Sequence, residues 1–111
     1  MDLVQEREYL KKQLNVSIKS LRENGTKLAE AEKEYKIAVN KKVLELKDSG
    51  MAATLIQLVI YGYEEIAKLR FLRDSAEVIY KANQEAINSL KLQIRIIDNQ
   101  IDKEWSNEEW I

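Results

Sequence analysis

Residues 50–71 read GMAATLIQLVIYGYEEIAKLRF, and this stretch decides how the chain folds. From Gly50 to Gly62 nearly every residue is apolar, and Thr54 and Gln57 are the clear polar exceptions. The run is too short to span a bilayer, and the segments on either side of it carry long helical patterns. It therefore predicts a connector at which one long helix ends and a second begins.

The composition favours helices and excludes several kinds of chemistry. The 111 residues include no proline and three glycines, so most of the sequence consists of good helix formers. Charged residues make up 33% and hydrophobic residues 45%, which is too apolar for a disordered segment. Cysteine and histidine are absent, which excludes disulfides, thiolate or imidazole metal ligands, and Ser–His or Cys–His catalysis.

A first long helix is predicted over about residues 2–48. Asp2 is placed to cap it, with Gln5 in the second position of a capping box. Gly50 follows the end of the pattern and is expected in the left-handed conformation that closes many helices. The apolar stripe of this helix advances in steps of three, four and seven. Its members are Leu3, Leu10, Leu14, Leu21, Leu28, Ala31, Tyr35 and Ala38.

Asn24 and Gly25 interrupt this stripe, and an Asn-Gly pair is usually a turn signal. The chain could break there, with Thr26 capping a new helix. The stripe nevertheless keeps its phase from Leu21 to Leu28, one heptad later, which a turn has no reason to preserve. We therefore expect one continuous helix, with any bend at Gly25 and a cost of about 1 kcal/mol for the glycine.

A second long helix is predicted over about residues 63–105, followed by a tail at 106–111. Its apolar stripe consists of Ile66, Leu69, Ala76, Tyr80, Ile87, Leu90, Ile94, Ile97 and Ile101. Arg73 and Asn83 fill the two polar positions of the stripe. Asn83 would either meet Asn24 where the two long helices pack together, or face water.

Two long helices joined by a connector at about 50–62 predict an all-α, coiled-coil-like antiparallel hairpin. It is expected to form a single domain over residues 1–111.

The connector can form a short helix of its own, with Thr54 as its cap. One interpretation folds this helix back onto the core of the hairpin, which would bury Leu55, Leu58 and Val59. The alternative leaves residues 51–61 as an exposed docking tip.

Each long helix also carries a second apolar row, which a hairpin of two helices cannot shelter. The residues predicted to mediate self-association are Phe71, Val78, Leu92, Ile96, Val16, Ile37 and Leu44. The connector cannot reach Leu92 and Ile96, which lie far along the second helix. Wide apolar patches are rarely left bare, so a second copy of the chain is the expected cover. Two hairpins would form a homodimeric four-helix bundle, and a different protein is the rival cover.

No catalytic, cofactor-binding or metal-binding residues are predicted. Di-metal sites in helical bundles use Glu-x-x-His pairs, and glutamates such as Glu30 and Glu45 lie off the main stripe. The sequence also contains no glycine-rich phosphate loop and no nucleophile elbow. We expect a non-enzymatic structural or adaptor protein that acts through protein–protein association and needs no cofactor.

Direct binding of nucleic acid is the alternative function. It would use local basic patches formed by Lys41, Lys42, Arg70 and Arg73. The formal net charge is −1 and the charges are interspersed, so no broad basic surface attracts phosphates. We therefore expect no nucleic-acid partner.

The last residues, 101–111, read IDKEWSNEEWI and contain a candidate docking segment. Glu108, Glu109, Trp110 and Ile111 combine negative charge with apolar side chains, a shape that basic, groove-bearing partners can grip. In the other interpretation, Trp105 packs on the end of the bundle and the last residues fray.

A family resemblance rests on two segments, NGTKLAEAEKEYKIAVNKKVLELKDSGM (24–51) and LRFLRDSAEVIYKANQEAINSLKLQIRIIDNQID (69–102). They resemble small helical proteins of phages and prophages of Gram-positive bacteria, often encoded in early replication and recombination regions. The resemblance implies a phage setting and an accessory role beside phage or host DNA-processing proteins, in the cytoplasm of the host cell. It transfers no activity and no functional residue.

Secreted WXG-type helical hairpins are similar in size and architecture. Their Trp-x-Gly turn is missing, because the connector reads IYGY at 60–63, and Tyr80 is followed four residues later by Gln84. The N-terminal sequence MDLVQEREYLKK also turns polar too early for a signal peptide. Secretion is therefore not expected, and no membrane association is predicted.

Overall fold

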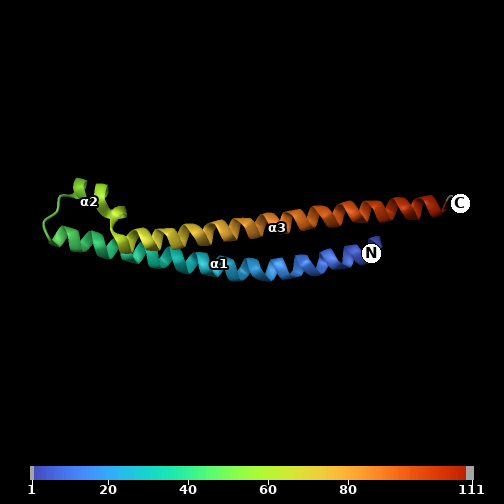
Figure 1. Ribbon diagram of the computed structural model, residues 1–111, viewed down its shortest axis with the longest axis horizontal. Coiled ribbons are helices and arrows are strands. Elements are labelled where there is room, and N and C mark those ends of the chain that lie inside the picture. Colours follow the sequence, from blue (N-terminus) through green and yellow to red (C-terminus); the bar gives the residue numbers. More distant parts are fainter. Residues whose placement is uncertain (1, 110–111) are drawn as a thin grey trace. The chain divides into compact units, whose positions relative to one another are not determined.

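The chain folds into two long α-helices joined by a short helical connector (Figure 1). The computed structural model describes residues 2–109, with side chains as far as residue 107. Its elements are α1 (Leu3–Asp48), α2 (Ala53–Val59), the 3₁₀ helix η1 (Ile60–Gly62) and α3 (Glu64–Glu109). The described residues contain no strand, and α3 packs against α1 in the opposite direction. The predicted all-α antiparallel hairpin is confirmed.

Two compact units make up the chain, and each is built from a piece of α1 and a piece of α3. The turn unit consists of residues 24–80 and includes the connector. The end unit consists of residues 2–23 and 81–109. Each unit has a hydrophobic core of its own.

The capping box predicted at the start of α1 is present. The backbone N–H of Gln5 donates to Oδ1 of Asp2 at 2.8 Å, and the backbone N–H of Asp2 donates to Oε1 of Gln5 at 3.3 Å. These bonds satisfy two backbone donors at a helix end, where no partner from the helix itself is available. Glu6 places negative charge in the first turn, where the helix dipole favours it.

Gly25 lies inside α1, which runs without a break from Leu3 to Asp48. A Cβ added to Gly25 would lie 3.3 Å from Cε2 of Tyr80 on α3. The glycine thus makes room for the tyrosine ring where the two helices meet. The prediction of a continuous helix is confirmed, and the Asn-Gly pair serves packing and not chain reversal.

α1 ends in a Schellman motif at Gly50, whose φ of 88° lies in the left-handed region. The backbone N–H of Met51 donates to the carbonyl oxygen of Leu46 at 3.0 Å, and that of Gly50 donates to the carbonyl oxygen of Lys47 at 3.0 Å. Met51 then packs in the same cluster as Leu46. The predicted left-handed glycine is therefore confirmed, and it turns the chain into the connector.

The connector folds back onto the hairpin, but the predicted choice of its buried residues is wrong. Ile56 and Ile60 are buried, whereas Leu55 is exposed, Leu58 is 82% exposed and Val59 is half-buried. Apart from Thr54 and Gln57 the connector is apolar, so its sequence gives little periodic contrast to mark an inner face. Packing against α1 and α3 decides which side is covered.

Two helix boundaries also differ from the predicted ones. α2 begins after Ala52 and no side chain caps it, so the predicted cap at Thr54 is wrong. α3 begins at Glu64 and runs to Glu109, so residues 106–109 continue a helix that was expected to end near 105.

The core of the turn unit joins α1, the connector and α3. Its buried residues are Tyr35, Leu46, Ile56, Ile60 and Ile66, and Ile66 is fully buried. Burial of one large aliphatic side chain stabilises a fold by about 1.5–3 kcal/mol. The connector is therefore a structural part of the hairpin and shelters one flank of it near the turn.

The end unit combines a small apolar core with polar contacts between α1 and α3. Its buried residues are Leu10, Ile97 and Ile101. Nη1 of Arg7 lies 3.3 Å from Oδ1 of Asp98. The side-chain amide of Asn83 donates to the carbonyl oxygen of Ser17 at 3.0 Å, so this asparagine links the two helices. Its meeting with Asn24 stays a prediction.

Candidate interaction surface

The residues predicted to mediate self-association are all exposed in the single chain. They are Val16, Ile37, Leu44, Phe71, Val78, Leu92 and Ile96. Phe71 is 68% exposed and Val78 is 67% exposed, although such side chains are usually buried. The fold of one chain therefore leaves these rows without cover.

The helical repeat places the exposed row of α1 on one flank of the hairpin. Tyr35 and Ala38 pack in the core of the turn unit and define heptad positions a and d. Ile37 and Leu44 then share position c. Position c lies about 130° round the helix from the middle of the a/d stripe, on the flank that also carries position g.

The exposed residues of α3 lie partly on the matching flank and partly on the outer face of the helix. Ile66 and Leu69 pack in the core and define positions a and d of this helix. Leu72 and Ile79 then occupy position g, about 90° round from the middle of the a/d stripe, whereas Phe71 and Val78 occupy position f, on the outer face opposite that stripe. Phe71, Val78 and Ile79 line one shallow depression together with Asp74 and Ser75, which confirms that the row is continuous on the surface.

In an antiparallel helix pair, the g flanks of both helices lie on the same side. Ile37 and Leu44 on α1 therefore share one side of the hairpin with Leu72 and Ile79 on α3, and Phe71 and Val78 extend this apolar side onto the outer face of α3. The apolar side consists of Ile37, Leu44, Phe71, Leu72, Val78 and Ile79, which are all the large exposed hydrophobic residues of the turn unit outside the connector. Leu72 and Ile79 were not predicted, although a heptad assignment of the second helix would have identified them.

The opposite flank of the turn unit is polar or covered. Position e is occupied there by Glu32 on α1 and by Arg70 and Glu77 on α3. Nearer the turn, the connector packs on this flank against Val39 and Val43. A hairpin that is apolar on one side only needs one further neighbour and not several.

The end unit has a less one-sided surface. Tyr9, Val16, Leu92 and Ile96 are exposed at positions c and f. Val4, Ile18 and Trp105 are exposed at position e, on the other flank. The heptad assignment therefore gives no single apolar side here.

Opposite charges border the exposed row of α1. Glu34 and Lys41 occupy position g, one heptad apart, with Ile37 between them. Both side chains are exposed, and neither forms an ion pair with another described residue. The two charged groups thus lie on either side of Ile37, three and four residues away from it.

Lys42, one of the predicted nucleic-acid contacts, forms ion pairs within the turn unit. Its Nζ lies 3.1 Å from Oε1 of Glu65 and 3.3 Å from Oε2 of Glu45. It also lies 4.3 Å from the centre of the Tyr63 ring. The hydrogen bond with Glu65 raises the pKa of Lys42 above its ordinary value, against a smaller opposing effect of desolvation. Lys42 therefore offers little free charge to a phosphate.

The two predicted arginines also have partners within the turn unit. Nη2 of Arg73 lies 2.7 Å from Oδ1 of Asp74, and its guanidinium centre lies 4.6 Å from the centre of the Tyr35 ring. The hydrogen bond with Asp74 raises the pKa of Arg73. The guanidinium of Arg70 stacks over Tyr61 at 5.0 Å. Arg70 and Arg73 thus make contacts within the chain, and they do not form one open basic patch with Lys41.

The predicted docking segment at the C-terminal end lies largely outside the described residues. Glu108 and Glu109 form the last residues of α3, and their side chains, together with Trp110 and Ile111, are outside the described part. Trp105 is 63% exposed in the single chain, and its packing on the end of a bundle stays a prediction.

Other kinds of site receive no support from the described residues. No group of acidic side chains between residues 2 and 107 is placed to hold a metal ion. None of the described helices has an apolar segment long enough to cross a bilayer. No known protein family, curated protein or solved structure matches the chain. The resemblance to phage proteins stays a prediction, and the function is inferred from the exposed surface.

Proposed function

We propose that this chain is a non-enzymatic structural or adaptor protein whose working form is a homodimer. In this homodimer, two hairpins pack against each other through their apolar sides and form a four-helix assembly. The observation that carries the proposal is the exposed apolar side of the turn unit, where Ile37, Leu44, Leu72 and Ile79 share one flank and Phe71 and Val78 continue it onto the outer face of α3. A contiguous apolar surface of this kind marks an association site, because isolated proteins seldom leave one in water.

Charge complementarity favours a second copy over an unrelated partner. A two-fold axis near Ile37 would place Glu34 of each copy beside Lys41 of the other, so the same pair forms twice. Both groups have no ion pair with any other described residue, so neither has to give one up. The charges would set the register of the two hairpins, and the apolar side chains would supply the affinity.

The free energy gained by covering the apolar side is comparable with the cost of association. Full burial of a large apolar side chain contributes about 1.5–3 kcal/mol, and these residues, which are roughly half to two-thirds exposed in the single chain, would each contribute a corresponding part of it. Part of that gain is offset by the lost freedom of two separate molecules, about 4–15 kcal/mol. The apolar side must therefore be covered over most of its length, which predicts that single polar substitutions within it weaken the dimer strongly.

Ile37 and Ile18 provide a matched test. Both are isoleucines on α1 with nearly equal exposure, 46% and 47%, but Ile37 occupies heptad position c and Ile18 occupies position e. We expect Ile37→Glu to raise the dimer dissociation constant at least tenfold, about 1.4 kcal/mol, at unchanged helix content. Ile18→Glu should leave the dissociation constant nearly unchanged. Equal effects of the two substitutions in sedimentation equilibrium would contradict association through the apolar side.

Direct nucleic-acid binding remains the alternative function, with less support. Lys42 and Arg73 are held by carboxylates, which competes with phosphate binding. An adaptor of the proposed kind should bind no duplex DNA at physiological salt. A DNA affinity that falls steeply as salt rises would instead support the alternative.

A further inference from the structure

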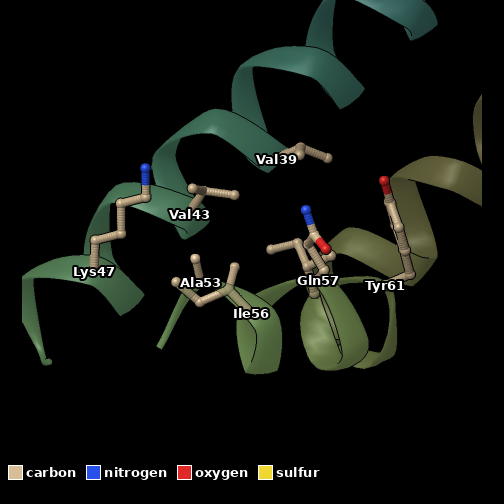
Figure 2. Close-up of a pocket in the computed structure, with 8 residues that line it drawn as sticks. Val39, Val43, Lys47, Ala53, Ile56, Gln57 and Tyr61 are labelled. Atoms are coloured by element: carbon tan, nitrogen blue, oxygen red, sulfur yellow. The ribbon is translucent and has the colours of Figure 1, made fainter. Parts of the chain in front are cut away.

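A cavity of about 440 Å³ lies between α1 and the connector in the turn unit (Figure 2). It is lined by Val39, Val43 and Lys47 of α1 and by Ala53, Ile56, Gln57, Ile60 and Tyr61 of the connector. Its volume falls within the range of about 300–1,000 Å³ that is typical of small-molecule sites. The cavity lies on the flank opposite Ile37 and Leu44, so it does not overlap the proposed dimer surface.

The lining of the cavity is apolar, and its polar groups lie at the edges. Val39, Val43 and Ile56 present methyl groups to it, as Figure 2 shows. In the same view Lys47 and Tyr61 lie at opposite ends of the cavity, with Gln57 between them. A few polar groups around an apolar lining are characteristic of sites that bind small amphipathic ligands.

The charge at the edge of the cavity is positive. Lys47 forms no ion pair with another described residue, in contrast to Lys42, which is held by Glu45 and Glu65. No carboxylate is among the lining residues. At the other end, the guanidinium of Arg70 lies 5.0 Å from the centre of the Tyr61 ring, which adds a second positive group and restrains that ring. The edge therefore suits an anion and disfavours a cation.

We propose that this cavity binds an aliphatic carboxylate. The alkyl chain lies against Val39, Val43 and Ile56, and the carboxylate accepts a hydrogen bond from the ammonium group of Lys47. The side-chain amide of Gln57, which lies between Lys47 and Tyr61, provides a further donor. A single unpaired lysine matches the single negative charge of such a head group. The proposal is independent of the dimer, because the two surfaces lie on opposite flanks.

Sodium octanoate is a suitable probe, with octylammonium and octan-1-ol as analogues that differ only in the head group. We expect octanoate to shift the backbone amide NMR signals of Val39, Val43, Ala53, Ile56 and Gln57 in a saturable manner. Octylammonium should bind at least tenfold more weakly, and octan-1-ol should fall between the two. Equal affinities of the octanoate and octylammonium ions would overturn the proposal. So would shifts centred on Phe71 and Val78, which would indicate unspecific adsorption to exposed apolar side chains.

Two substitutions locate the site. Lys47→Gln should weaken octanoate binding at least tenfold and leave octan-1-ol binding unchanged, whereas Lys36→Gln, on an exposed part of the same helix, should change neither. Ala53→Leu should fill the cavity and weaken both ligands. Octanoate binding that survives Lys47→Gln and Ala53→Leu would show that the ligand lies elsewhere. Helix content and dimer mass are measured for each variant, because they report folding and self-association separately from ligand binding.

Discussion

Gly25 on α1 faces the ring of Tyr80 on α3, and a Cβ at position 25 would lie 3.3 Å from Cε2 of that ring. The contact explains why a long helix retains a residue that weakens helices by about 1 kcal/mol relative to alanine. The absence of a side chain at position 25 lets the aromatic ring approach the backbone of α1. Helix propensity and packing therefore oppose each other at this position.

Substitution of Gly25 measures how far helix propensity and packing against Tyr80 offset each other. We expect Gly25→Ala to be nearly neutral, because a propensity gain of about 1 kcal/mol is offset by displacement of the Tyr80 ring. In a Tyr80→Leu background the ring is gone, and the same substitution should stabilise by about 1 kcal/mol. Urea unfolding of the four chains gives the coupling between the two positions. Equal effects of Gly25→Ala in both backgrounds would show that the contact does not constrain position 25.

Gly50 and Gly62 bracket the connector but differ in conformation. Gly50 has a φ of 88°, whereas Gly62 is not in the left-handed region, and a Cβ at Gly62 would meet nothing within 4 Å. Gly50→Ala should destabilise the chain by about 1–2 kcal/mol, because a residue with a Cβ is strained there. Gly62→Ala should change the free energy of unfolding by less than about 0.5 kcal/mol. A reversed order of these two effects would be inconsistent with the Schellman motif.

The proposed register of the dimer makes a charge-reversal prediction. Glu34→Lys would place like charges together in the dimer, since position 41 of the second copy is a lysine, and Lys41→Glu would do the same with glutamates. Each single reversal should weaken association several-fold, most strongly at low salt. The double variant restores opposite charges and should recover most of the affinity. A double variant as weak as the single ones would contradict the two-fold contact between these residues.

The pH dependence of stability should be flat near neutrality. The chain has no histidine and no cysteine, so no side chain has an ordinary pKa between about 6 and 8. The pKa of Lys42 is raised by Glu65, which means that protonation of this lysine favours the folded state. Its contribution is complete below the ordinary lysine pKa of 10.5 and is lost as the pH rises through the higher folded value.

Comparison of Lys42→Met with Lys36→Met isolates this contribution from the titration of tyrosines and other lysines. We expect the free energy of unfolding of the parent chain to stay constant from about pH 6 to 9 and to fall above about pH 10.5. The difference between Lys42→Met and the parent should shrink in that upper range, whereas Lys36→Met should follow the parent throughout. A difference that is independent of pH would show that the pairing of Lys42 with Glu65 does not affect stability.

The helical plan of the hairpin could be predicted because it depends on short-range signals. Asp2 and Gln5 are three residues apart, and their capping box needs nothing from the rest of the chain. Gly50 ends a helix through its own backbone conformation. The apolar stripe keeps the same phase on either side of Gly25, and this was enough to predict one continuous helix. The packing role of the glycine became visible only from its contact with Tyr80.

The features that could not be predicted depend on tertiary packing. Ile56 and Leu58 are equally apolar, and only the fold of the connector against α1 decides that one is buried and the other exposed. The cavity beside Lys47 arises from the same event, because its two walls are distant until α2 folds back. Likewise, the stacking of Arg73 on Tyr35 joins residues from different helices, so a polar position in the stripe gave no hint of its partner.

The mass of the unmodified chain in solution tests the central claim most directly. One chain has a mass of 13.0 kDa, so the proposed dimer has twice that mass. In sedimentation velocity over a hundredfold range of concentration, we predict the dimer mass at the upper end and dissociation to single, helical chains only on dilution. A well-folded chain that sediments at 13.0 kDa even at the highest concentration would contradict the account, because its apolar side would then face water permanently.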